Sequence, residues 1–526
     1  MTVMLKFLRP KRIAPSRRLD RRDWITIGGG LLVFFAVSLP TITASSIWFD
    51  EAFGAYLIRF NFAEVARYTA SDVHPPLYYW ALKVWSSWFG SNEFAMRSMS
   101  VFFGAVALVF AWLLVRRWFG RHVAATALTM MVITPFFIRY SQEMRMYTMV
   151  VAIAFAATYV LTIADKSKKT WQWIIYGLLV GIGMLTHYYV ALIWVTHWVW
   201  RLIIYRSSGF KGRELAHVYF GRGWIYAHLI AFALFAPWIG ALMSQIHDVQ
   251  VNGFWILPFT PATPIDFLTS VILYMHQTTV QSWAALVFGI FIIGMIALFM
   301  AVYRRTLQSE RRDYLLLITL MAAIPPILLL LASLPPLRPS FVDRYLTPSA
   351  LSLGLLIGVS IGLARPLMRR GLWWGILVTT VAIFGYGISN VYRLGNYNAD
   401  KSMSNNTRQV IDEIRKRTPD TAIIADSSWT YYEAAFYSTS QSPVSFIDAN
   451  VDYKYGSLLM LKENDLGKIK DLASFESAHQ TFWVMGRPGD SEVMQPSANL
   501  YVIDQFRIND TITGQAAYEA IEYKVL

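Results

Sequence analysis

Two neighbouring carboxylates, Asp50 and Glu51, follow the first long apolar stretch of the sequence. A carboxylate that is partly desolvated beside a second one is suited to act as a general base. The pair could also be a solvated helix start, with Asp50 as the N-cap and Glu51 favoured by the helix dipole. The two residues alone leave both interpretations open.

A second polar group is rich in arginine. Arg139 and Arg145 lie with Glu143 and Tyr147 in the segment IRYSQEMRMY, between two apolar stretches. Guanidinium groups present forked donors that match phosphate oxygens. The competing interpretation is an arginine–Glu143 ion pair at a helix end, and the two interpretations are compatible.

Three further side chains lie at the ends of apolar stretches. His74 precedes two prolines, which could hold its imidazole near a membrane surface or simply mark a helix start. Arg97 opens the second apolar stretch, and His187 lies in a short turn with two tyrosines. A lone histidine is more often structural than a ligand, and tyrosines at such turns also serve as interfacial anchors.

Arg344 and Tyr345 lie in the later segment FVDRYLTP, where Asp343 could simply neutralise Arg344. Together with the groups above, they predict a ring of positive charge that could surround an anionic head group. The arginines expected on this one side are Arg59, Arg67, Arg97, Arg139, Arg145, Arg338 and Arg344.

The elements that must position these residues are membrane-spanning helices. The chain has 526 residues, of which 55% are hydrophobic and only 15% charged, which excludes an ordinary soluble enzyme. Apolar stretches of about the length that a bilayer requires predict about eleven spans. They lie at 24–47, 94–115, 123–138, 146–164, 171–186, 188–205, 224–243, 281–303, 314–333, 348–364 and 371–390.

The distribution of positive charge predicts the orientation. With the N-terminus in the cytoplasm, the basic tail 1–23 and the other inner loops hold 26 Lys and Arg, against seven in the outer segments before residue 391 when Arg97, at a helix start, is left out. The basic excess therefore indicates anchored loops rather than nucleic-acid binding. The first span, Trp24–Ile47, is predicted to be a retained signal anchor, and Pro76–Gly90 a helix lying in the membrane interface.

From about residue 391 the composition becomes polar, with 13 Lys and Arg against 18 Asp and Glu. Alternating patterns predict a small α/β domain over 391–526, outside the membrane and after the transmembrane domain 24–390. The predicted helices are Arg408–Arg417 and Trp429–Tyr437, and the predicted strands are Thr421–Ala425, Thr481–Met485, Leu500–Phe506 and Tyr518–Val525. No cysteine is present, which excludes disulfides, thiolate catalysis and Cys-based metal sites.

Several segments, in this order, resemble one enzyme family: FDEAF, VHPPLYYWALKVWSSWFGSNEFAMRS, RRWFGRH, RYSQEMRMY and FVDRYLTP. They are similar to the bacterial protein O-mannosyltransferase and aminoarabinose-transferase group, which are GT-C glycosyltransferases that use polyprenyl-phosphate sugar donors. The resemblance covers roughly residues 20–365 and does not extend to the α/β domain.

The resemblance implies a role for each matching residue. Asp50 falls on the catalytic base that activates the acceptor hydroxyl, and Glu51 on the adjacent acid that positions acceptor or donor. His74 begins the HPPL motif beside the donor site. The implied donor- and phosphate-binding residues are His74, Arg97, Arg139, Glu143, Arg145, Tyr147, His187, Arg344 and Tyr345.

A metal stays unassigned. In the aminoarabinose transferases a lysine replaces the HPP histidine and a metal is implicated, whereas the protein O-mannosyltransferases need no essential metal. This chain carries the histidine at position 74. No cofactor is therefore expected as a requirement, and a divalent metal stays open.

The sequence thus predicts an inverting glycosyltransferase of the cell membrane that moves a sugar from a polyprenyl phosphate to a hydroxyl group of the cell envelope. The C-terminal domain is expected to select or hold the acceptor. A lipid or solute transporter is the alternative, but its ionisable groups should lie near the middle of the bilayer and not at one face. A non-catalytic relative that binds cell-wall material is a third possibility.

Overall fold

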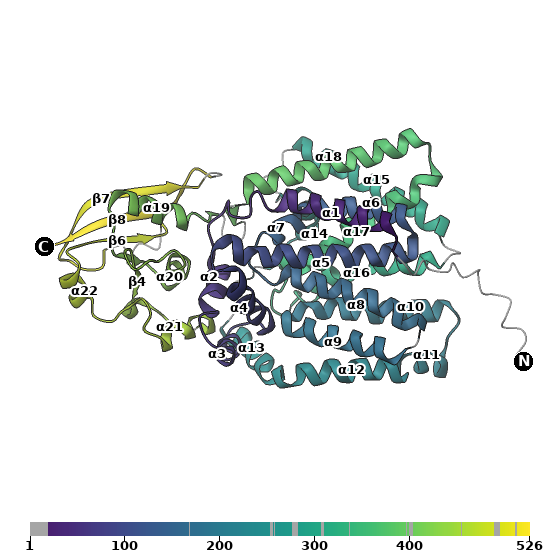
Figure 1. Ribbon diagram of the computed structural model, residues 1–526, viewed down its shortest axis with the longest axis horizontal. Coiled ribbons are helices and arrows are strands. Elements are labelled where there is room, and N and C mark those ends of the chain that lie inside the picture. Colours follow the sequence, from purple (N-terminus) through teal and green to yellow (C-terminus); the bar gives the residue numbers. More distant parts are fainter. Residues whose placement is uncertain are drawn as a thin grey trace, which may run out of the picture.

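The apolar stretches of the sequence fold into long helices that run side by side, and a smaller α/β domain lies at one end of the bundle (Figure 1). The structure is a computed structural model that describes residues 19–526, except 168, 253–255, 257, 276–281, 307–309, 336, 396, 399–402, 454, 489–494 and 511–512. Most of the tail 1–23 therefore lies outside the described residues.

Each predicted span overlaps a helix of the bundle. These helices are α1 (Arg21–Ser38), α5 (Glu93–Phe119), α6 (Arg121–Val132), α7 (Pro135–Ser141), α8 (Tyr147–Ser167), α9 (Thr170–Thr186), α10 (Ala191–Ser207), α12 (Arg222–Phe235), α15 (Ser282–Thr306), α16 (Arg311–Leu331), α17 (Thr347–Ala364) and α18 (Arg370–Leu394). Two shorter helices, α11 (Gly212–Tyr219) and α14 (Thr263–Leu273), complete it.

The polytopic helical fold class is confirmed, whereas fewer helices than the predicted eleven have the full length and composition of a span. Among the described residues, seven helical stretches do, one of which is Arg222–Val251, where α13 (Ile239–Asn252) continues α12; there are eight if the bent pair α6–α7 is one span. The three other predicted spans fall short of this length and composition. Helix α1 has 18 residues and begins with three charged ones, whereas α9 and α10 have 17 residues each.

Two prolines explain where the predicted spans were wrong in detail. The first span does not reach Ile47, because α1 ends at Ser38, shortly before Pro40. Pro40 has no N–H, so it cannot continue the helical hydrogen bonds beyond this point. The third span is broken into α6 and α7, which meet at an angle of 62° where Pro135 begins α7. The proline lacks the N–H that a continuous helix would use.

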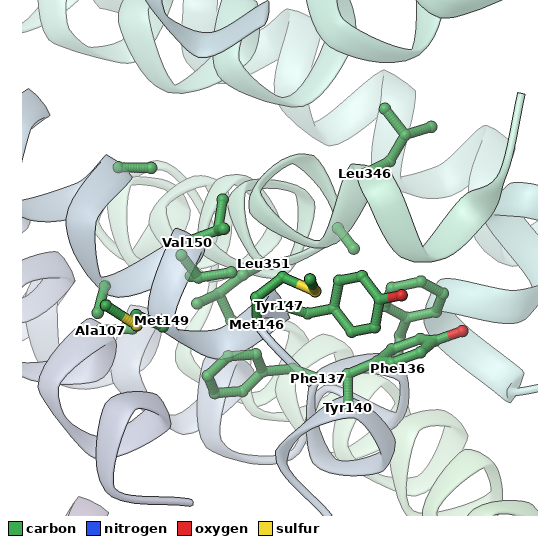
Figure 2. Close-up of a cluster of buried hydrophobic side chains, with 14 of the residues drawn as sticks. Ala107, Phe136, Phe137, Tyr140, Met146, Tyr147, Met149, Val150, Leu346 and Leu351 are labelled. Atoms are coloured by element: carbon green, nitrogen blue, oxygen red, sulfur yellow. The ribbon is translucent and has the colours of Figure 1, made fainter. Parts of the chain in front are cut away.

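Small residues bring helices into close contact. A Cβ atom added to Gly358 of α17 would lie 2.5 Å from the Cα of Ala127 in α6. Only glycine permits this distance, which is typical of packed membrane helices. Beside this contact, aromatic and methionine side chains of α7 and α8 fill the core together with Leu351 of α17 (Figure 2). The polar residues between α7 and α8 thus rest on a dense apolar support.

Four helices lie between the bundle and the α/β domain (Figure 1): α2 (Phe49–Leu57), α3 (Phe62–Ser71), α4 (Leu77–Phe89) and α13 (Ile239–Asn252). The helix predicted at Pro76–Gly90 is α4, which has 13 residues. This is too short to cross a bilayer. Its position in the interface stays a prediction.

The α/β domain contains a six-stranded sheet with strand order β5-β4-β3-β6-β8-β7. Strands β5, β4, β3 and β6 are parallel, whereas β8 pairs antiparallel with both β6 and β7. All six elements predicted here overlap the observed ones. The elements are α19 (Thr407–Arg417), β3 (Ile423–Ala425), α20 (Ser428–Ala435), β4 (Val444–Ile447), α21 (Leu459–Glu463), β5 (Lys468–Ile469), α22 (Leu472–Ala478), β6 (Thr481–Gly486), β7 (Leu500–Asn509) and β8 (Ala516–Val525). A separate two-stranded antiparallel sheet pairs β1 (Tyr397–Asn398) with β2 (Met403–Ser404).

Aromatic rings join the two domains. Helix α20 packs against α2, where the ring centroids of Tyr56 and Tyr432 are 5.2 Å apart and those of Phe49 and Trp429 are 4.7 Å apart. The Tyr437 hydroxyl also accepts a 2.9 Å hydrogen bond from the Ile47 amide. The α/β domain is therefore fixed directly above the helix that carries Asp50.

Candidate functional site

A large cavity separates the end of the bundle from the α/β domain. Its volume is about 1230 Å³. Its walls come from α2, α3, α13, the segment before α4, the α7–α8 connection and the α/β domain. Pockets for a single small ligand are typically about 300–1,000 Å³, so this cavity has room for more than one group.

Asp50 lies on the cavity wall in the first turn of α2. Its side chain is 23% exposed, and an Oδ2 atom lies 3.5 Å from Arg145 and 3.9 Å from Arg344. The helix begins at Phe49 with Trp48 as its N-cap, so the interpretation of Asp50 as the N-cap is wrong. The carboxylate thus faces the cavity beside two guanidinium groups.

Arg145 connects the acidic and imidazole sides of the cavity. It donates hydrogen bonds to the Asp50 carbonyl at 3.2 Å and to the Tyr79 hydroxyl at 3.2 Å. Its Nη2 atom lies 3.3 Å from His74 Nε2. Because arginine can only donate, Nε2 must accept this bond. His74 Nδ1 then carries the hydrogen and donates to Asp72 at 3.2 Å.

Glu51 and Arg97 form a buried pair behind this wall. Glu51 is 1% and Arg97 2% exposed, and the two side chains form two hydrogen bonds of 2.6 and 2.8 Å. Arg97 also donates to the carbonyls of Ile42, Ser45 and Ser46 at 2.9–3.2 Å. All five of its N–H groups are used, so the structure does not bring Arg97 to the cavity as a phosphate ligand.

Glu51 fixes the segment that presents Arg145. One carboxylate oxygen accepts from the Met144 amide at 2.8 Å, and the other lies 3.4 Å from the Trp48 amide. The same side chain therefore holds both the start of α2 and the connection between α7 and α8. Asp50 directly precedes Glu51, and Arg145 directly follows Met144. The Glu51–Arg97 pair therefore positions both Asp50 and Arg145.

Arg139 and Glu143 pair with each other at 3.1 Å and do not line the cavity. Arg139 also donates to the Tyr274 hydroxyl at 3.2 Å. Burial raises the pKa of Glu143 to about 7, against the lowering effect of Arg139. The ion-pair interpretation of this segment is therefore confirmed for Arg139, whereas Arg145 faces the cavity.

His187, Tyr147 and Tyr345 form an aromatic layer beside His74. The His187 ring lies 5.1 Å from Tyr345, 5.7 Å from His74 and 6.3 Å from Tyr147. Of the three, only Tyr345 lines the cavity. Burial, followed by the nearby charges of His74 and two arginines, holds the pKa of His187 well below its usual value. His187 is therefore an uncharged packing partner of this layer.

The expected ring of seven arginines is not formed. Arg145 and Arg344 lie at Asp50, and Arg67 lines another part of the cavity while it pairs with Glu463 of the α/β domain. The others contact backbone carbonyls or their own partners, including Arg59 at Ala435 and Arg338 at Gln250. Among the described residues, no group of three His, Asp or Glu side chains is placed to hold a metal ion.

Sequence analysis missed several cavity residues. Asp72 lies two positions before His74, a spacing that could have suggested their hydrogen bond. Tyr79 of α4 does not line the cavity but accepts a hydrogen bond from Arg145, and no motif marks it in the sequence. The cavity residues Trp429 and Tyr455 come from the α/β domain, whose sequence gave no resemblance and so no signal.

Comparisons with known proteins agree with this arrangement. Residues 73–241 match a family model described as dolichyl-phosphate-mannose-protein mannosyltransferase. No curated protein matches the chain in sequence. The fold is similar to that of ArnT from Cupriavidus metallidurans in the apo state, with a TM-score of 0.60 and 14% identity over 95% of this chain and 97% of that one.

The chain has a GT-C fold. ArnT bound to undecaprenyl phosphate also matches, with a TM-score of 0.54 and 15% identity over 95% of this chain and 98% of that one. Unlike the sequence resemblance, these matches extend over the α/β domain. The family model and the fold bear out the resemblance found in the sequence.

Proposed function

We propose that this protein is an inverting membrane glycosyltransferase that transfers a sugar from a polyprenyl phosphate to an acceptor hydroxyl. The observation that carries the proposal is Asp50 beside Arg145 and Arg344 on the wall of a cavity of about 1230 Å³. A base and an anion site thus lie within one side-chain length of each other. The mannosyltransferase family model and the GT-C fold support the same chemistry.

The reaction needs one displacement at the anomeric carbon. Asp50 accepts the proton of the acceptor hydroxyl as its oxygen bonds to that carbon. The bond from the carbon to the phosphate oxygen breaks, and the polyprenyl phosphate leaves with the electron pair. Arg145 and Arg344 stabilise the charge that develops on this phosphate. Attack from the face opposite the leaving group inverts the configuration.

The surrounding residues keep these groups in place. Asp72 holds His74, whose Nε2 accepts from Arg145 Nη2, the same atom that lies 3.5 Å from Asp50 Oδ2. His74 therefore helps to orient the guanidinium. Glu51 and Arg97 hold the two segments that carry Asp50 and Arg145. We assign Glu51 and Arg97 to positioning because neither lines the cavity, whereas Asp72 and His74 lie on the cavity wall and orient Arg145 from there.

The placement of the charged residues favours an enzyme over a transporter. Asp50, His74, Arg145 and Arg344 gather at the end of the bundle next to the α/β domain. A transport path would require ionisable groups deeper among the helices, where each is costly. From the basic loops we infer that this end lies outside the cytoplasm, with the N-terminus inside.

The first experiment identifies the donor. Purified protein is incubated with a panel of radiolabelled polyprenyl-phosphate sugars, and donor consumption is measured. One donor should be consumed by the wild type. Replacement Asp50→Asn should reduce the rate by about 10²–10⁴-fold, because it removes a general base.

The control is Asp465→Asn, which removes a carboxylate paired with Lys470 on the exposed surface of the α/β domain. This variant should transfer sugar at the wild-type rate. Binding of undecaprenyl phosphate should survive in Asp50→Asn, since the arginines remain. Transfer at an unchanged rate in Asp50→Asn would refute the base role.

A further inference from the structure

The α/β domain presents an exposed tryptophan to the cavity. Seven of the eight residues of α20 are buried, and Trp429 is the exception, with 36% of its surface exposed. Tyr455, which is 42% exposed, lies beside it with a centroid distance of 5.8 Å and ring planes inclined at 60°. Both residues line the cavity. Full burial of a large apolar side chain stabilises by about 1.5–3 kcal/mol. A ligand that covers the exposed faces of Trp429 and Tyr455 would therefore gain part of this free energy on binding.

Trp429 packs against the helix that carries the proposed base. The edge of Phe49 contacts Trp429 with a centroid distance of 4.7 Å and an interplanar angle of 69°. Phe49 directly precedes Asp50 in the first turn of α2. Trp429 and Asp50 both line the cavity, so a group that stacks on Trp429 lies in the same cavity as the Asp50 carboxylate.

Polar side chains border the aromatic pair within the same cavity. Asp72 and Asp248 contribute carboxylates and Lys462 an ammonium group. A prenyl chain on this surface would desolvate these charges without hydrogen bonding to them, which is costly. A ligand that suits the surface has flat apolar faces and hydroxyl groups at its edges. A sugar ring has both, because its C–H groups face one side and its hydroxyl groups radiate outward.

We propose that Trp429 and Tyr455 bind a carbohydrate ring of the acceptor, so that the acceptor is a glycan. This inference rests on the proposed glycosyltransferase function and adds the acceptor class to it. The C–H groups of the ring meet the electron-rich faces of the aromatic side chains. The hydroxyl groups reach the charged border, and one of them reaches Asp50. The cavity volume accommodates this ring together with the sugar of the donor.

The test measures glycan binding to the intact protein in detergent. The probes are defined oligosaccharides of hexose, pentose and N-acetylhexosamine units and a serine- and threonine-containing peptide, detected by saturation-transfer NMR and titration. At least one oligosaccharide should bind the wild type. Trp429→Ala should weaken its binding by about tenfold, and Trp429→Phe, which keeps a ring, by less.

A further variant tests Tyr455, and another, outside the cavity, is its control. Tyr455→Ala should weaken oligosaccharide binding, whereas Tyr501→Ala should not. Tyr501 has a similar exposure, 40%, but lies on β7 and does not line the cavity. Binding of undecaprenyl phosphate should be unchanged in all of these variants.

Three results would overturn the acceptor assignment. The first is that the peptide binds but no oligosaccharide does. The second is that the oligosaccharide affinity is unchanged in both Trp429→Ala and Tyr455→Ala. The third is that these variants weaken undecaprenyl phosphate binding as much as they weaken oligosaccharide binding. Failure of the proposed function would be a separate result. In that case no polyprenyl-phosphate sugar would be consumed by the wild type, whatever its glycan binding.

Discussion

Replacement of Arg97 by lysine tests whether this residue positions the site or binds phosphate. The guanidinium makes five hydrogen bonds, two to Glu51 and three to backbone carbonyls of residues 42–46. Lysine has three donors, so at least two of these buried acceptors lose their partner. Each costs about 1–3 kcal/mol, which predicts a loss of at least about 2 kcal/mol of stability. Arg97→Met, which also leaves Glu51 unpaired, should cost about 3–5 kcal/mol.

The assay compares the thermal unfolding midpoint in detergent with the affinity for undecaprenyl phosphate, measured well below that midpoint. Arg97→Lys should lower the midpoint and leave most of the lipid affinity. Arg145→Lys is the matched control, because its side chain lines the cavity. It should show the opposite pattern, with weaker lipid binding. A stable Arg97→Lys variant that has lost its lipid affinity would show that our positioning argument is wrong.

Two further predictions concern stability. Because burial raises the pKa of Glu143 to about 7 from 4.5, its neutral form stabilises the fold below pH 4.5 and this contribution is lost as the pH rises through 7. The unfolding midpoint of the wild type should therefore fall over this window more steeply than that of Glu143→Gln, and parallel profiles would contradict the assignment. Gly358→Ala should destabilise the protein by about 1–3 kcal/mol, because its Cβ would meet the backbone of Ala127 at 2.5 Å. Gly294→Ala, where a Cβ meets nothing within 4 Å, is the control and should not lower the midpoint.

The bundle could be predicted well because its signal is local. Each apolar stretch is long enough to identify a helix without knowledge of its neighbours, and the strands of the α/β domain follow short apolar runs. The errors lie at Pro40 and Pro135, where the effect of a proline depends on the rest of the fold. A proline can end a helix, as after α1, or bend a span, as between α6 and α7.

Only part of the predicted site lies on the cavity wall, and the pairings were not predicted. Arg97, Arg139, Glu143, Tyr147 and His187 do not line the cavity. Asp50, His74, Arg145 and Arg344 come together as expected from their shared position at the helix ends. The sequence could not tell which arginine faces the cavity, because Arg97 and Arg145 are both near helix ends beside acidic residues. Burial decides between them, and burial depends on tertiary packing.

The sequence led us to expect that the α/β domain holds the acceptor, but it could not show which of its residues line the cavity. Trp429 and Tyr455 lie more than 370 positions from Asp50, and an aromatic residue in an amphipathic helix normally indicates a core position. Only the docking of α20 on α2 turns Trp429 toward the cavity.

The shared turn of α2 limits how this enzyme type can be rebuilt. Phe49 contacts Trp429 of the α/β domain, whereas Asp50, its neighbour in the chain, lies beside Arg145 of the α7–α8 connection. A chimera that exchanges only residues 391–526 with those of a relative would place a foreign aromatic surface against Phe49. The altered contact would tilt the start of α2 and move the Asp50 carboxylate with it. Successful grafts should therefore carry α2 and α20 as one unit, and natural changes in either helix should be accompanied by changes in the other.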